Sequence, residues 1–232
     1  MIQAKTLSVI IPSLNEGDSL RLNLQRLQVL RSCGYEVILI EAGDSRLNLD
    51  EKTEFCDLVL QSELGRAKQM NLGAKFASGK WLLFLHADTR LPAGFELSIS
   101  KTLSNPSFLW GWFDVSFDVS GLSYSVIAKL MNIRARLTSI STGDQTLVVN
   151  NGLFRKLKGF ADIPIMEDIE ITSRLRRYAK PVVIRGFVTT SARRWQREGV
   201  LRTILLMWSL RFLFFIGVSP RKLVNYYYKS LD

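Results

Sequence analysis

The sequence predicts an α/β domain built on a parallel sheet and followed by an apolar helical segment. The first observation is a set of short, continuously apolar runs, which are typical of strands covered on both faces. These runs lie at residues 7–11, 36–40, 57–60 and 81–85. The second observation is that helical patterns separate the runs. Strand and helix alternate four times before residue 90, which indicates a doubly wound, Rossmann-like half.

The remaining elements follow in chain order. Leucines at three- and four-residue spacing predict a helix over 16–31, and small apolar residues on one face predict another over 65–77. After residue 105 the alternation loosens. We expect strands at 109–119 and 145–149, helices at 121–140 and 166–179, and a long apolar helix at 200–218.

No Pro/Gly-rich linker, charge block or fixed repeat marks a domain boundary. We therefore expect one domain over residues 1–195 and a helical extension over 196–232, packed on the domain, a partner or a membrane surface. The apolar run at the amino terminus is followed closely by Pro12 and Asn15, which fits a strand better than a signal peptide.

Composition narrows the classes of function. With 232 residues, 47% of them hydrophobic, the chain can bury a core and is not a disordered or fibrous protein. Its 31 basic and 21 acidic residues give a net charge of +10, which favours anionic partners. Two cysteines and one histidine cannot form an ordinary Cys/His zinc site, and they fit a reducing, cytoplasmic location. The aromatic residues lie in apolar runs, so we expect no nucleic-acid partner.

The segment at 200–218 leaves three alternatives open. It nearly has the length of a membrane-spanning helix, but it carries Arg202 and Arg211. It can be buried against the domain or the second subunit of a homodimer, lie on an anionic membrane surface, or span the membrane. Basic residues on both flanks favour the membrane surface, which would make the protein peripheral on the inner face of the membrane.

Polar and acidic residues follow three strands of the predicted sheet. Ligands of such sheets bind beyond the carboxyl ends of the strands, so we expect these residues to meet there. Acids gathered in a chain of positive charge suggest a divalent metal that joins the protein to a diphosphate. The alternative is that each acid caps a helix. The residues are Pro12, Asn15 and Glu16 after the first strand, Glu41, Gly43 and Asp44 after the second, and His86, Ala87 and Asp88 after the fourth.

Three further motifs carry charge. Gly65 opens a helix whose first turn holds Arg66 and Lys68, two cations of the wrong sign for the helix dipole. This helix start and Arg66 or Lys68 could therefore hold phosphate oxygens, unless both cations are simply solvated. Glu167 and Asp168 open another helix, where they suit the dipole or deprotonate an acceptor hydroxyl. The run Arg193-Arg194-Trp195 places two guanidinium groups beside an indole, which could bind a leaving phosphate or stack on a ring. The alternative is that the run is an ordinary basic patch.

In this order and spacing the motifs resemble the inverting family 2 glycosyltransferases of the GT-A fold, whose sheet is mixed and mostly parallel. Residues 8–16 resemble the opening strand and nucleotide-binding turn, and 41–44 the acidic turn that contacts the base. Residues 86–88 resemble the D-x-D metal motif with His86 as its first residue, 167–168 the E-D motif, and 194–195 the end of Q-x-x-R-W, with Ser191 at the Gln position. Runs such as IMEDIEITSRLRR are similar to small glycosyltransferases associated with arsenosugar biosynthesis or radical-SAM gene neighbourhoods.

The resemblance implies a nucleotide-diphosphate sugar donor, in particular a UDP-sugar, and Mn²⁺ or Mg²⁺ held by Asp88 and His86. Asp168 would be the general base and Glu167 would position the acceptor or the helix start, in one displacement that inverts the anomeric configuration. The implied donor-binding residues are Pro12, Asn15, Glu16, Glu41, Gly43, Asp44, Gly65, Arg66, Gln69, Ala87 and Asp88. Those implied for the acceptor or a phosphate are Gln145, Arg193, Arg194 and Trp195.

Two alternatives keep the same donor site. In one, the enzyme is associated with a membrane and the acceptor is a lipid phosphate rather than a small molecule. In the other, the chain binds a nucleotide sugar without catalysis. A nucleotidyltransferase is disfavoured because no G-x-G-T-R loop follows the first strand.

Overall fold

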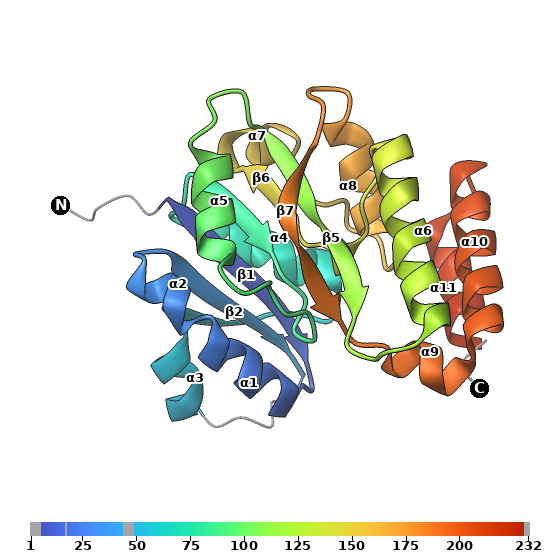
Figure 1. The fold of residues 1–232 in the computed structure, drawn as a ribbon, viewed down its shortest axis with the longest axis horizontal. Coiled ribbons are helices and arrows are strands. Elements are labelled where there is room, and N and C mark those ends of the chain that lie inside the picture. Colours follow the sequence, from blue (N-terminus) through green and yellow to red (C-terminus); the bar gives the residue numbers. More distant parts are fainter. Residues whose placement is uncertain (1–5, 17, 44–48, 230–232) are drawn as a thin grey trace.

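The computed structural model describes residues 6–16, 18–43 and 49–229. These residues form a seven-stranded sheet in the order β3-β2-β1-β4-β6-β5-β7 (Figure 1). Strand β6 is antiparallel to β4 and β5, and the other neighbouring strands are parallel. The expected mixed, mostly parallel sheet is therefore confirmed. The strands are β1 (Leu7–Leu14), β2 (Glu36–Ala42), β3 (Leu58–Gln61), β4 (Trp81–Phe84), β5 (Trp110–Phe117), β6 (Leu147–Asn150) and β7 (Val182–Thr190).

Helices cover both faces of the sheet, and each face has its own hydrophobic core. Successive residues of β1 alternate between the cores, with Val9 and Ile11 in one and Ile10 in the other. Because both faces of the first strands are buried, the central residues of these strands are apolar. The helices on the first core are α1 (Asp18–Arg26), α2 (Gln28–Ser32) and α5 (Phe95–Leu103), and those on the second include α4 (Arg66–Phe76), α7 (Asn151–Lys156) and α8 (Glu167–Leu175).

Several elements differ from the sequence-based expectation. The helix expected over 16–31 is two helices, because the chain tightens at Leu27, whose N–H lies 3.1 Å from the carbonyl oxygens of both Asn23 and Leu24. Strand β7 was not expected, since its burial alternates and Gly186 interrupts its apolar residues. A short helix, α3 (Leu49–Phe55), also precedes β3.

The last part of the chain is helical and lies beside α6 (Leu122–Thr138) at one end of the molecule (Figure 1). Its helices are α9 (Arg193–Glu198), α10 (Val200–Phe215) and α11 (Pro220–Lys229). A small third core of Met166, Leu210 and Leu223 joins α10 and α11 to the start of α8. Over the described ranges, no helix is both long and apolar enough to cross a membrane. The boundary at residue 195 stays a prediction.

Candidate active site

A cleft of about 320 Å³ lies beyond the end of β4. Its walls include the loop after β4, the short 3₁₀ helix at Gly143–Gln145, the start of α8, the residues around α9, and individual residues of α4, α10 and α11. These segments are far apart in the sequence, and the sheet brings them together at one edge. Among the residues expected in the site, the cleft is lined by Arg66, His86, Asp88, Glu167, Asp168, Arg194 and Trp195.

The imidazole of His86 packs against the backbone of Gly143, so closely that a Cβ at that position would lie 2.2 Å from His86 Cε1. Its Nδ1 lies 3.7 Å from Asp144 Oδ1. Burial opposes the ionisation of Asp144, but His86 and then Arg66 outweigh it and hold the pKa of Asp144 below its ordinary value. Asp144 is therefore an ionised carboxylate on the wall of the cleft.

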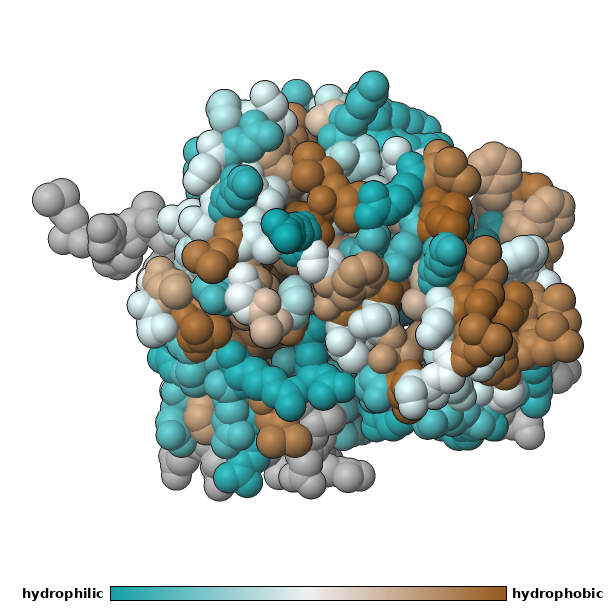
Figure 2. All heavy atoms as spheres, in the orientation of Figure 1, coloured by the Kyte–Doolittle hydropathy of each residue, from teal (hydrophilic) through white to brown (hydrophobic). Residues whose placement is uncertain are grey.

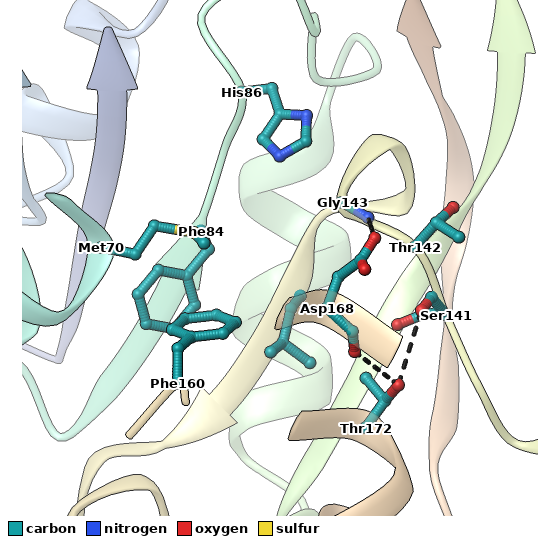
Figure 3. A pocket seen from close by; sticks show the side chains of 10 residues that line it. Met70, Phe84, His86, Ser141, Thr142, Gly143, Phe160, Asp168 and Thr172 are labelled. Atoms are coloured by element: carbon teal, nitrogen blue, oxygen red, sulfur yellow. Dashed lines mark hydrogen bonds between the residues drawn. The ribbon is translucent and has the colours of Figure 1, made fainter. Parts of the chain in front are cut away.

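Asp168 is held in place by the backbone on both sides. Its Oδ2 accepts a hydrogen bond from Gly143 N at 2.7 Å, and its Oδ1 accepts one from Ile169 N at 2.7 Å. Figure 3 shows the carboxylate turned toward Gly143, and the hydroxyl of Thr172 below it, which donates to the Asp168 carbonyl oxygen at 2.7 Å. Each carboxylate oxygen has two lone pairs, so Asp168 keeps acceptor capacity for a substrate.

Glu167 is buried, with a side-chain exposure of 7%, and its Oε1 lies 3.9 Å from Arg66 Nη1. Burial and the neighbouring charge of Asp168 raise the pKa of Glu167, and Arg66 opposes this only in part. Burial lowers the pKa of Arg66, but Glu167 and Asp144 outweigh it and raise that pKa above its ordinary value. Arg66 is thus a permanent cation between two carboxylates.

The arginines of α9 take two different positions. Arg193 Nη2 lies 4.0 Å from both Glu16 Oε2 and Asp88 Oδ2, and so it joins the ends of β1 and β4. Arg194 hydrogen-bonds to the hydroxyl of Tyr227, with its guanidinium 4.2 Å from the centre of that ring. Arg193 therefore faces the expected donor residues, while Arg194 ties the cleft to α11.

The residues expected after β1 and β2 form a second group beside the cleft. Gly43 has a φ of +78° and lies so near Asn15 that a Cβ would be 3.0 Å from Asn15 Oδ1. Glu41 is buried and pairs with Lys52 at 2.7 Å. Pro12 and Ala87 are buried, Gly65 is exposed, and Asp44 lies outside the described residues.

Two predicted site residues serve the backbone instead. Gln69 is buried, and its amide donates to the carbonyls of Ser13 and Ile40 at 2.7 and 3.0 Å. Gln145 is fully buried, and its Oε1 accepts from Thr142 N at 3.2 Å in a capping box. Neither lines the cleft.

Asp144, Arg211 and Tyr227 also line the cleft, although no sequence motif marked them as site residues. The signal for Asp144 was its place beside Gln145 in the run TGDQ, where only the turn decides which side chain faces the cleft. Arg211 and Tyr227 lie in helices that have no motif of their own.

The residues of the cleft fit a divalent metal that is shared with a diphosphate. No cluster of three or more His, Cys, Asp or Glu side chains in the described ranges could hold a metal alone. Mg²⁺ typically binds one or two carboxylates together with substrate phosphates and water. Asp88, with a side-chain exposure of 33%, offers such a carboxylate at the cleft. His86 also lines the cleft, although its Nδ1 faces Asp144.

Comparisons with known proteins place the chain among families and folds. The model of the family described as glycosyl transferase family 2 matches residues 8–155. A curated protein from Haemophilus influenzae, an "uncharacterized glycosyltransferase", is 23% identical over 180 residues, which cover 73% of this chain and 61% of that protein. The chain therefore spans about three fifths of the length of this relative.

Solved structures with the same fold include TarS and a mannosyltransferase. TarS from S. aureus aligns with a TM-score of 0.63 and 17% identity, over 80% of this chain and 36% of that one. Residues 1–349 of TarS in complex with UDP-GlcNAc align with a TM-score of 0.62 and 18% identity, over 80% of this chain and 58% of that one. The mannosyltransferase PcManGT from Pyrobaculum calidifontis, in complex with GDP-Man and Mn²⁺, aligns with a TM-score of 0.63 and 14% identity. The alignment covers 90% of this chain and 65% of that one. The expected fold class is confirmed.

Proposed function

Because the chain belongs to glycosyl transferase family 2, we propose that it transfers a sugar from a nucleotide-diphosphate sugar to an acceptor hydroxyl. The observation that carries the proposal is the cleft beyond β4, where Asp88, Asp168 and Arg66 meet beside the ends of β1 and β2. TarS and PcManGT were solved with UDP-GlcNAc and GDP-Man, which supports a donor of this class.

In this proposal the donor lies along the strand ends. Asn15 and Gly43 would contact the nucleoside, and the helix start at Gly65 and Arg66 would hold phosphate oxygens. Asp88, with His86 beside it, would hold Mn²⁺ or Mg²⁺ between the protein and the diphosphate. When bound, such an ion offsets the negative charge that develops on the leaving diphosphate.

Asp168 would remove the proton of the acceptor hydroxyl as the acceptor oxygen attacks the anomeric carbon. The two backbone hydrogen bonds to Asp168 fix the orientation of its carboxylate, as a general base requires. Attack opposite the leaving group in one displacement would invert the configuration. Glu167, buried beside Arg66, would position the helix start and the acceptor. Arg194 and Trp195 would bound the acceptor side of the cleft.

The donor site is tested by calorimetric titration of the protein with UDP, GDP and their common sugar conjugates, each with and without Mn²⁺. We expect one nucleotide to bind more tightly with Mn²⁺ present, and Asp88→Ala to abolish this gain. Glu96→Ala, on α5 and outside the cleft, is the matched control and should keep it. If Mn²⁺ has no effect on any nucleotide, the assignment of Asp88 fails.

The catalytic step is tested with Asp168→Asn. We expect turnover to fall by about 10²–10⁴ while donor binding persists. Asp162→Asn, an exposed acid outside the cleft, should keep full turnover. Full turnover of Asp168→Asn would remove Asp168 from the mechanism. If the wild-type protein binds a donor but transfers it to none of the acceptors tested, the non-catalytic alternative is supported.

The narrower expectations stay proposals. They are a UDP-sugar donor, a cytoplasmic location, and a relation to the glycosyltransferases of arsenosugar or radical-SAM gene neighbourhoods. A homodimer and a contact with an anionic membrane surface rest on the same apolar helical extension.

A further inference from the structure

An apolar groove of about 530 Å³ opens between α6 and α10. This volume falls within the roughly 300–1,000 Å³ of small-molecule sites. The groove is open along its length, since the side chains of Leu130, Leu137 and Trp208 are 53%, 81% and 65% exposed. Figure 2 shows apolar side chains gathered over this end of the molecule. Its apolar lining residues include Leu130, Ile133, Leu137, Ile204, Met207 and Trp208, and we call it the α6–α10 groove.

The inner end of the α6–α10 groove reaches the active-site cleft. Asp144, Trp195, Met207 and Arg211 line both. Arg211 also lines a third cavity, of about 420 Å³, between α10 and the start of α8. A ligand in the groove can therefore extend from the apolar surface to the residues assigned to the reaction.

Two half-buried arginines line the groove. Arg211 lines the cleft as well, and Arg134 lines the third cavity as well. Arg134 Nη2 and Arg211 Nε are buried and have no hydrogen-bond partner in the part of the chain that the structure describes. Burial lowers the pKa of Arg134, although Asp168 and Asp144 act in the opposite direction. Buried guanidinium nitrogens without a partner are costly, and a phosphate has enough acceptor oxygens to pair with both arginines.

We propose that the α6–α10 groove binds the apolar chain of a lipid-phosphate acceptor, and that Arg134 and Arg211 bind its phosphate. A second copy of the chain or a flat membrane surface would cover the exposed apolar residues, and neither need bring an acceptor to the buried Arg134 Nη2 and Arg211 Nε. An amphiphile with a terminal anion matches both ends of the groove. This inference rests on the donor site of the proposed function, and it replaces the acceptor hydroxyl of that proposal by a phosphate oxygen.

The transfer step would then form a bond between one phosphate oxygen and the anomeric carbon of the donor sugar. The bond from that carbon to the diphosphate breaks, and its electron pair leaves with the nucleoside diphosphate. Where the acceptor phosphate still carries a proton, Asp168 receives it. The product is a lipid-linked sugar phosphate.

The test uses farnesyl phosphate and farnesol as probes, titrated into the full chain below their micelle concentrations. We expect farnesyl phosphate to bind more tightly than farnesol. Leu130→Asp places a carboxylate in the groove and should weaken farnesyl phosphate binding at least about tenfold. Val126→Asp, one turn earlier on α6, is the matched control, since Val126 is 47% exposed and lies outside the groove lining.

The phosphate site is tested separately. Arg134→Gln should weaken binding of farnesyl phosphate about tenfold and leave farnesol binding unchanged. Lys129→Gln removes an exposed cation of the same helix outside the groove, and should change neither. Equal affinity for the two probes, or equal losses in Leu130→Asp and Val126→Asp, would overturn the inference.

Other occupants give distinct results. A dimer that Leu130→Asp dissociates, with no farnesyl phosphate binding, overturns the inference in favour of a second copy. Binding to anionic phospholipid vesicles that farnesyl phosphate does not compete for overturns it in favour of a membrane surface. Nucleotide titration of the same preparation separates the two proposals. Donor binding without farnesyl phosphate binding refutes only the acceptor, whereas absence of any nucleotide binding refutes the proposed function.

Discussion

Replacing Gly143 by alanine tests whether the loop at Gly143–Gln145 organises the site. The added Cβ would lie 2.2 Å from His86 Cε1 and 2.4 Å from His86 Nε2, too close for either ring atom to stay in place. The φ of Gly143 is outside the left-handed range, so the substitution acts through this clash and not through backbone strain. The imidazole must move, although β4 and the loop after it leave it little space, since His86 is 9% exposed.

The cost of such overpacking is about 1–3 kcal/mol. For a chain of this size, each kcal/mol lowers Tm by about 2–4 °C, so we expect a loss of roughly 2–12 °C. Moving His86 also disturbs its contact with Asp144 and shifts the N–H of Gly143 that binds Asp168. Weaker nucleotide binding or turnover should therefore accompany the loss of stability.

The assay is thermal unfolding of Gly143→Ala, His86→Ala and the double variant. Because His86→Ala vacates the space that the new methyl group enters, Gly143→Ala should cost less in that background than in the wild type. Gly152→Ala is the control, since its Cβ would meet only Asn150 Oδ1, at 3.2 Å. If the effects of the two substitutions on Tm are additive, or if Gly143→Ala keeps the wild-type Tm, then the added methyl group does not clash with His86.

Three further predictions concern stability. Asn23, which is 2% exposed, donates to two carbonyls of the loop after β4 at 3.2 and 2.8 Å, so Asn23→Leu should cost roughly 1–3 kcal/mol in urea unfolding and weaken nucleotide binding. Arg174 pairs with Glu170 and donates to the Gly159 carbonyl at 2.7 Å, so Arg174→Lys should cost roughly 1–3 kcal/mol by thermal unfolding, and an unchanged Tm would contradict this. Because the pKa of Glu167 is raised, Glu167 stays protonated in the folded chain at pH values where it has ionised in the unfolded chain. The free energy of unfolding should therefore fall as the pH rises from about 4.3, the ordinary pKa of Glu, through the raised pKa. Glu167→Gln should remove that fall in urea unfolding measured across this range, and an unchanged slope would show that Glu167 does not cause it.

The sequence predicted the first half of the fold well because burial there is nearly complete. Strand β1 sends Val9 and Ile10 into different cores, so nearly every residue is apolar and the strand is visible as a run. Strand β7 lies at the edge of the sheet, where burial alternates. Gly186, with a φ of +121°, lies near the register shift between β7 and β5, so no simple period describes this strand.

The site was predictable where residues follow strands and not where a turn decides their direction. Asp88 and Glu16 lie after strands whose ends meet at one edge of the sheet, and the structure joins them through Arg193. Asp144 and Gln145 are adjacent, but the 3₁₀ helix sends Gln145 into the capping box and Asp144 to the cleft. The sequence offers two polar residues there, and only the backbone selects between them.

The same short loop couples three parts of the proposed site. The N–H of Gly143 donates a hydrogen bond to the carboxylate of Asp168, and the backbone of Gly143 packs against the ring of His86. Asp144 lines both the cleft and the α6–α10 groove. A ligand that orders the loop from the groove would therefore also fix the base and the residue beside Asp88. If so, farnesyl phosphate should strengthen nucleotide binding, and by linkage the nucleotide should strengthen farnesyl phosphate binding by the same factor. Independent binding of the two ligands would show that the loop is already fully ordered without either.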